Sequence, residues 1–236
     1  MKKIIFLTVL FLAPLRYAQY NIENFSVAIS GVYTNSAKIF LNPNSSDEIL
    51  RNNFFPVEDI FNPALDIRYR HNQNILIGIS AEYMKKSAVG NNLTVFSNGV
   101  TTNINVEDGF ILIPIELSAY YFLPFSTEQF IFLMGGGLGY YYGQQTRSFG
   151  DAEISNINTQ FAYGIHVALS TDYVIRDFFS VRLEMKFRDP QFSVKSEYNK
   201  TEVSYNDETL ILPQKTFDSK INVNGISFLL GFVFHF

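Results

Sequence analysis

Six charged residues at strand-like spacing are the first candidates for chemistry in this 236-residue sequence. Each lies on the polar side of a segment in which polar and apolar residues alternate, so a β-sheet would turn all six toward one face. They are Arg68, Glu82, Glu116, Arg182, Glu184 and Lys186. Charges enclosed in a protein must be paired and hydrogen-bonded, which this mixture of acids and bases allows. The set therefore predicts a mutually neutralising polar network that fills an interior, and a gate or a proton path is the functional alternative.

Other motifs offer little chemistry. The GGGLG stretch at 135–139 resembles a phosphate-binding loop, but no Lys-Ser/Thr pair follows it and it lies within a strand-like segment. The sequence has three histidines, His71, His166 and His235, and no ligand spacing suited to a metal surrounds them. Of these, His166 faces the polar side near mid-strand, where Ser170 or Glu116 could approach it. We therefore predict no catalytic residue, no cofactor and no metal site.

Eight segments with period-two alternation must position these residues. They span Phe25–Thr34, Ala64–Arg70, Ile75–Lys86, Phe110–Leu123, Phe130–Tyr142, Phe161–Tyr173, Phe179–Arg188 and Ile226–Phe236. On every segment one face carries large apolar residues and the other carries small or polar ones. Gly135, Gly137 and Gly139 on the second face suit the crowded inside of a narrow barrel. A charge on the first face would cost about 2–4 kcal/mol at mid-depth in a membrane, so we expect that face to contact lipid.

The alternation predicts an all-β fold: an eight-stranded antiparallel up-and-down transmembrane β-barrel over residues 19–236, forming one domain. Backbone groups in hydrocarbon must all be paired, so a membrane sheet has to close on itself. The connections after the second, fourth and sixth segments are tight, near 71–74, 124–129 and 174–178, and the others are long. A soluble eight-stranded barrel with its polar face outward is the structural alternative.

Three local features refine this prediction. Pro114 lies inside the fourth segment and removes one ladder hydrogen bond, which predicts a bulge or a local kink. The Asn98-Gly99 pair predicts a tight hairpin turn, so the third and fourth segments are expected to continue beyond the membrane. The long connection at 190–223 contains the strand-like pieces FSVKS and TEVSY. Such extended hairpins would expose sheet edges that bind a partner chain by strand addition, or would merely shield the barrel.

The start of the chain and its composition bound the class of protein. Lys2 and Lys3 precede an apolar run from Ile4 to Ala13, which predicts a secretory signal peptide over residues 1–18. Its removal would lower Lys+Arg from 18 to 15 against 22 Asp+Glu, and a formal charge that falls from −4 to −7 argues against nucleic acid as a partner. Without cysteine the chain has neither a disulfide framework nor an acylated-cysteine anchor. No later apolar run reaches about 18 residues, which excludes transmembrane helices.

The sequence closes on GFVFHF, with Phe232, Phe234 and Phe236 at alternate positions. Together with the export signal, the eight amphipathic segments and the alternating connections, this ending resembles the bacterial outer-membrane β-barrel family. The stretch IPIELSAYYF at 113–122 is similar to small barrels of the outer-membrane-protein β-barrel domain type. The resemblance, which covers nearly the whole chain after the signal, implies that the three phenylalanines form the signal read by the outer-membrane assembly machinery. It also implies contact with membrane lipid and lipopolysaccharide, periplasmic termini and extracellular long loops.

The expected function is a non-enzymatic surface or scaffold role, or that of an accessory subunit, with a protein partner at the extracellular loops or in a larger outer-membrane complex. A narrow channel or a lateral route for small or apolar solutes is the alternative, although eight strands leave an interior just filled by side chains. Some barrels of the resembled family are lipid-modifying enzymes or proteases whose sites need a His near Ser, Asp or Glu at the outer rim. A lipid-modifying enzyme that uses His166 is therefore the third hypothesis.

Overall fold

The chain folds almost entirely into β-strands. A computed structural model describes residues 24–236 except 98, 160 and 207, so the predicted signal peptide lies outside the described residues. The elements are β1 (Phe25–Phe40), α2 (Glu48–Asn52), β2 (Phe54–Arg70), β3 (Ile75–Glu82), β4 (Met84–Ser97), β5 (Val100–Phe122), β6 (Phe130–Phe149), β7 (Ala152–Thr159), β8 (Ala162–Arg176), β9 (Phe179–Arg188), β10 (Gln191–Tyr198), β11 (Glu202–Tyr205), β12 (Glu208–Ile211), β13 (Thr216–Asn222) and β14 (Gly225–His235). Within this part of the chain, no helix has the length and apolar content needed to cross a membrane.

Eight of the strands close into a ring. Each strand pairs antiparallel with the next in the order β1, β2, β3, β5, β6, β8, β9 and β14. The ladder from Ser26↔His235 to Thr34↔Ser227 then joins β14 back to β1. The last residue takes part, because the Phe236 amide donates to the Phe25 carbonyl at 2.8 Å and the Phe236 carbonyl accepts from the Phe25 amide at 3.1 Å. The prediction of an eight-stranded antiparallel barrel is confirmed.

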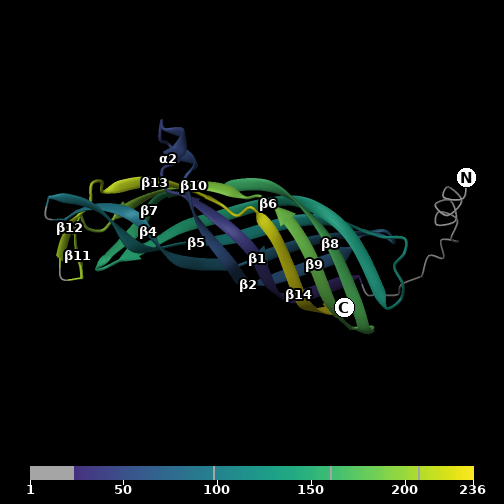
Figure 1. Cartoon of the computed structure of the whole chain (residues 1–236). Coiled ribbons are helices and arrows are strands. Elements are labelled where there is room, and N and C mark those ends of the chain that lie inside the picture. The colour runs from purple at the N-terminus through teal and green to yellow at the C-terminus, as the bar shows by residue number, and fades with distance from the viewer. Residues whose placement is uncertain (1–23, 98, 160, 207) are drawn as a thin grey trace, which may run out of the picture.

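The two ends of the barrel differ as the alternating connections predict. Tight turns at 71–74, 123–129 and 177–178 lie at one end, and the last is shorter than predicted because β8 continues to Arg176. Figure 1 shows the C-terminus at this same end, and the long strands leaving the ring in the opposite direction. We call the part beyond the ring, made by β4, β7, β10 to β13 and the adjoining halves of β5 and β6, the extension.

The extension is built from strands that the sequence partly predicts. β4 and β5 form a hairpin that reaches Ser97↔Val100, and Gly99 in its turn has a φ of +78°, while Asn98 lies outside the described residues. The strand-like pieces predicted in 190–223 are β10 and β11. β13 pairs with both β10 and β1, so this long connection returns to the barrel as a sheet.

The predicted third strand, Ile75–Lys86, is interrupted at Tyr83. The ladder of β5 pairs Ala81 with Ile115 and resumes with Met84 opposite Leu112, in unchanged register. Pro114 lies opposite this interruption. The Phe122 backbone amide donates to the Asn74 carbonyl, so the amides of even-numbered residues in β5 point toward β3. Residue 114 is one of these positions, and proline has no N–H group to donate to β3. The predicted bulge does not occur in β5. The register between β5 and β6 continues unchanged through the pair Pro114↔Tyr141, and the irregularity lies at Tyr83, between β3 and β4.

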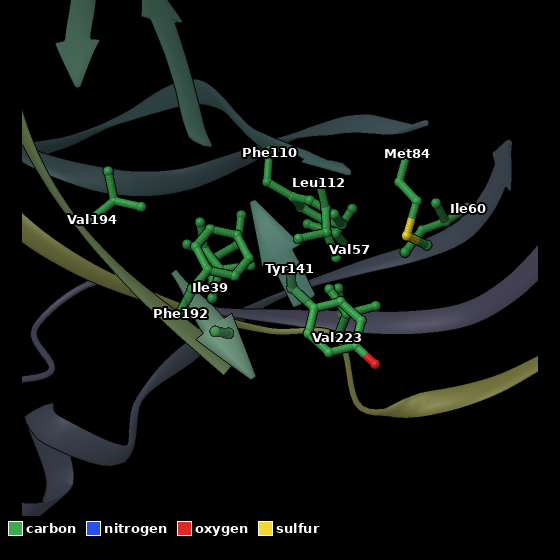
Figure 2. Packing of buried hydrophobic residues seen from close by; sticks show 13 residues of the cluster. Ile39, Val57, Ile60, Met84, Phe110, Leu112, Tyr141, Phe192, Val194 and Val223 are labelled. Carbon is green, nitrogen blue, oxygen red and sulfur yellow. The ribbon is translucent and has the colours of Figure 1, made fainter. Parts of the chain in front are cut away.

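A buried apolar cluster fills the ring where it meets the extension. Figure 2 shows its residues converging from strands of both parts. We call it the apolar layer: Ala37, Ile39, Val57, Ile60, Met84, Phe110, Leu112, Tyr141, Ala162, Phe192, Val194, Ile221 and Val223. A second cluster, which includes Val95, Val106, Tyr198 and Val203, forms the core of the extension farther from the ring.

Candidate functional site

The outer face of the ring carries a continuous apolar surface. Ile29, Leu138, Ile165 and Leu230 are 61%, 66%, 72% and 62% exposed, although they lie within paired strands of the ring. Monomeric soluble proteins rarely expose contiguous apolar patches of this kind, and such patches mark membrane or protein contacts. The face that the sequence predicts to contact lipid is therefore the outward one, and the polar face lines the inside.

All six charged residues of the predicted network are buried inside the ring. Near the apolar layer, Arg188 forms a bidentate salt bridge with Glu82, from Nη1 to Oε1 at 2.8 Å and from Nη2 to Oε2 at 2.7 Å. The Lys186 ammonium donates to Glu116 Oε2 at 2.7 Å and to Glu82 Oε1 at 3.3 Å. Bidentate and charge-assisted bonds of this kind are the strongest that side chains form.

The network continues toward the tight-turn end. Arg182 holds Asp172 through Nε and Nη2, both at 2.7 Å, and reaches Asp66 through Nη1 at 2.6 Å. Arg68 donates to Glu184 at 2.5 Å and lies 2.8 Å from Asp66. The Arg68 guanidinium also lies over the Tyr120 ring, 3.8 Å from its centre. A Cβ atom on Gly135 would overlap that ring, which supports the prediction that the glycines of β6 leave room inside.

Sequence reasoning left three members out of the network. We define the charged layer by its full membership: Asp66, Arg68, Glu82, Glu116, Asp172, Arg182, Glu184, Lys186 and Arg188. Asp66, Asp172 and Arg188 share strand parity with the predicted residues, so the same period-two argument could have included them.

The charged layer closes the interior. Most of its ion pairs run between strands that are not neighbours in the ring, as from Arg68 on β2 to Glu184 on β9. Arg182 also holds Asp172 on the neighbouring strand β8, and Arg68 pairs with Asp66 within β2. A cavity of about 20 Å³ borders Arg68, Arg182 and His235, and one of about 10 Å³ borders Asp66 and Glu184. Each has room for about one water molecule. The layer therefore fills the lumen at this height, and its ion pairs connect strands on opposite sides of the ring.

The histidines have ordinary structural partners. His166 Nε2 lies 2.8 Å from Ser118 Oγ, so its partner is neither Ser170 nor Glu116. His235 Nε2 lies 2.8 Å from Ser180 Oγ. Among the described residues no group of His, Cys, Asp and Glu could hold a metal ion.

A further buried ion pair, not predicted, lies in the extension. Arg147 contacts Asp108 through Nε at 2.6 Å and Nη2 at 3.0 Å, and donates to the Tyr198 hydroxyl at 2.9 Å. Burial by itself would lower the pKa of Arg147, but Asp108 and Tyr198 together outweigh it and the pKa is raised. Burial raises the pKa of the Tyr198 phenol against the opposing effect of Arg147. Both shifts keep Arg147 charged and the Tyr198 phenol neutral near neutral pH.

The wall of the barrel is interrupted on one side, beyond Tyr83. The Tyr83 amide still donates to Pro63 on β2 at 3.2 Å. Farther from the tight turns, the described residues of β2 pair with β1 and those of β4 pair with β5 and β12, with no ladder between β2 and β4. We call this the β2–β4 seam. Lys86 crosses it to the Asp59 carbonyl at 3.2 Å, and the Phe55 ring packs at Gly90.

A second interruption, between β6 and β7, is closed by a side chain. The amide group of Asn156 donates to the Gln145 carbonyl at 3.0 Å and accepts from the Gln145 amide at 3.1 Å. The Asn156 side chain thus forms the two hydrogen bonds to the Gln145 backbone that a neighbouring strand would otherwise form. The β2–β4 seam has no such substitute among the described residues and is the weaker part of the wall.

Comparison with solved structures identifies the fold. The outer membrane protein OprG from Pseudomonas aeruginosa superposes with a TM-score of 0.62 at 12% identity, covering 93% of this chain and 99% of that one. Neisserial surface protein A gives 0.48 at 14% identity, over 90% of this chain and 97% of that one. Neither a protein-family model nor a curated protein sequence matches the chain.

Proposed function

Since the chain has the eight-stranded fold of bacterial outer-membrane β-barrels, we propose that it is a non-enzymatic outer-membrane protein whose closed barrel supports a rigid extension at the cell surface. Its role is adhesion, envelope integrity or that of an accessory subunit in a larger outer-membrane complex. In this proposal the termini are periplasmic and the extension is extracellular.

The filled interior is the observation that supports this function best. A channel needs a continuous polar path, whereas here the charged layer is tied across the lumen and the apolar layer lies directly above it. The extension has its own apolar core and its own buried ion pair, so it is a folded structure rather than a set of loops. A barrel with a filled lumen and a folded extension is suited to presenting a binding surface.

The end of the extension carries exposed apolar residues that fit a protein partner. Phe96 on β4 pairs with Ile211 on β12, and these side chains are 45% and 52% exposed. Interfaces are anchored by such apolar and aromatic residues in the centre of a polar rim. We call Phe96 and Ile211, which lie opposite each other on one face of the sheet, the tip patch.

Gentle detergent extraction of the tagged native protein, followed by sizing and identification of what co-purifies, tests this proposal. We expect a stoichiometric partner that is lost from a Phe96→Gln/Ile211→Gln variant. Ile157→Gln, at an exposed position on β7, is the matched control and should keep the partner. A lone particle of monomer size in the wild type would contradict the accessory-subunit role. Discrete single-channel steps in planar bilayers would contradict the closed barrel.

The β2–β4 seam favours a second candidate function, a lateral route for apolar solutes. The seam lies beside Ile60 and Met84 of the apolar layer. An apolar solute that enters through the extension would pass between β2 and β4 into the membrane, without crossing the charged layer. Because the chain has no cysteine, Asp59→Cys and Lys86→Cys would allow a short bis-maleimide to bridge the seam. Entry of an apolar fluorescent dye into cells should then fall. Ser36→Cys with Glu58→Cys, across the intact β1–β2 ladder, is the control, and equal entry in both would exclude this route.

A further inference from the structure

Two lysines on the outer face of the sheet have no acidic partner. Lys38 on β1 and Lys220 on β13 are half-buried, and neither forms an ion pair within the described part of the chain. Each ammonium lies instead over a phenylalanine ring. Lys38 Nζ is 4.7 Å from the centre of Phe54, and Lys220 Nζ is 4.5 Å from the centre of Phe40. Such cation–π contacts hold an ammonium in place without neutralising its charge.

The strand register gathers these four residues into one patch. Phe40 lies directly opposite Phe54 on β2 and opposite Lys220 on β13, and Lys38 lies opposite Asn222. The two lysines are therefore diagonal neighbours on adjacent strands, with Cβ atoms roughly 7–8 Å apart. The two phenyl rings are 5.7 Å apart, centre to centre. The sheet thus presents two charges and two rings side by side on its outside.

The height of this patch follows from its distance along β1. Tyr33 and Phe61 are the last aromatic residues of the apolar band on these two strands, and Lys38 comes five residues after Tyr33. At about 3.3 Å per residue and a strand tilt near 40°, Lys38 lies about 12 Å beyond the edge of the band. That height is outside the hydrocarbon, among the polar headgroups of the outer leaflet and the sugars attached to them.

We propose that Lys38, Lys220, Phe40 and Phe54 form a binding site for the phosphorylated sugar headgroup of lipopolysaccharide. The two ammonium groups would each donate to phosphate oxygens, for which Lys is a common point-charge ligand. The exposed ring of Phe54 would pack against the C–H face of a sugar. The site rests on the proposed location of the barrel in the outer membrane, with the extension outward.

The test uses the full-length barrel in phospholipid nanodiscs, titrated with fluorescently labelled lipopolysaccharide. The Lys38→Gln/Lys220→Gln variant keeps the shape of the patch and removes its charge. At roughly a fivefold loss for each charged contact near the surface, its affinity should fall by about 10- to 50-fold. Lys215→Gln is the matched control, because Lys215 directly precedes β13 but is paired with Glu197 at 2.5 Å. The affinity of this variant should change by less than about twofold.

Three results would overturn the site. The double variant could bind as tightly as the wild type, the Lys215 control could lose as much affinity as the double variant, or enzymatically dephosphorylated lipopolysaccharide could bind the wild type as tightly as the native lipid. Circular dichroism and flotation with lipid vesicles report separately on the premise. A folded, vesicle-bound barrel with unchanged binding in the double variant would refute the site alone. A chain that does not enter bilayers would refute its proposed location.

Discussion

The charged layer and the apolar layer fill one barrel by two different physical means. In the charged layer, arginine and lysine side chains reach across the lumen to acids on strands far away around the ring, as from Lys186 on β9 to Glu116 on β5. In the apolar layer, residues such as Phe192 and Val194 from the extension pack against the ring without a fixed partner. The first is directional and joins chosen strands, whereas the second depends on volume.

This difference sets how each layer should respond to substitution. Removing one member of a buried ion pair leaves a charge without water or partner, whereas removing both members together costs much less. In an apolar layer the cost follows the volume that is lost. The predictions below contrast these two behaviours, beginning with the largest effect.

Arg188→Met should destabilise the barrel most. Arg188 binds both oxygens of Glu82 and also lies 3.2 Å from Glu116 Oε1, so its loss would leave Glu82 without its main partner and Glu116 with one donor fewer. We expect a fall of about 3–5 kcal/mol in the free energy of unfolding. Reversible urea unfolding from lipid vesicles would measure it. A fall below about 1 kcal/mol would mean that the layer is hydrated rather than tightly paired.

A double-mutant cycle on Lys186 and Glu116 should show the directional coupling. Lys186→Met alone would remove the shortest contact to the Glu116 carboxylate, whereas Lys186→Met with Glu116→Gln would remove both charges. We expect the double variant to be about 1–3 kcal/mol more stable than the sum of the two single losses predicts. The same urea titration applies. Additive losses would show that the pair does not act as a unit.

Ile221→Val tests the apolar layer with a smaller change. Ile221 is fully buried there, and removing one methylene group should cost about 1 kcal/mol of unfolding free energy. Ile165→Val is the control, because Ile165 is 72% exposed on the outer face of the ring and its loss should change stability by less. Equal costs at the two positions would argue against tight packing in the layer.

The smallest effect is expected at the end of the extension. The Asp151 side chain accepts hydrogen bonds from Lys200 and from the Ser204 amide, and the contact with Lys200 is the main reason that the pKa of Asp151 lies below its usual 3.8. A carboxylate with a lowered pKa contributes stability above its ordinary pKa, and that contribution disappears as pH falls through the lowered value.

The Ser204 amide signal in an NMR pH titration would measure this effect. It should shift with a midpoint below 3.8, as the contact between the β6–β7 turn and β11 weakens. The shift should be absent in Asp151→Asn. A midpoint at or above 3.8 in the wild type would show that the contact with Lys200 does not persist.

The charged layer and the extension each contain features that the sequence predicted and features that it did not. Period-two spacing assigned Arg68, Glu116 and Lys186 to the inside, and the strand pieces in 190–223 were visible as well. The interruption at Tyr83 was missed, because the sequence alternates through it without a break. The buried Arg147–Asp108 pair was also missed, because these residues come from strands whose pairing in the extension the sequence does not specify.

The sequence by itself determined the number of ring strands and the face that each turns outward. A β-strand alternates its side chains whatever its neighbours are, so the pattern can be read along one segment at a time. Only the tertiary structure decided which acid meets which base, that the interior divides into a charged and an apolar layer, and that the described residues of β2 and β4 form no ladder. Those features join residues such as Arg68 and Glu184 that lie 116 positions apart, and they depend on how the strands are staggered around the closed ring.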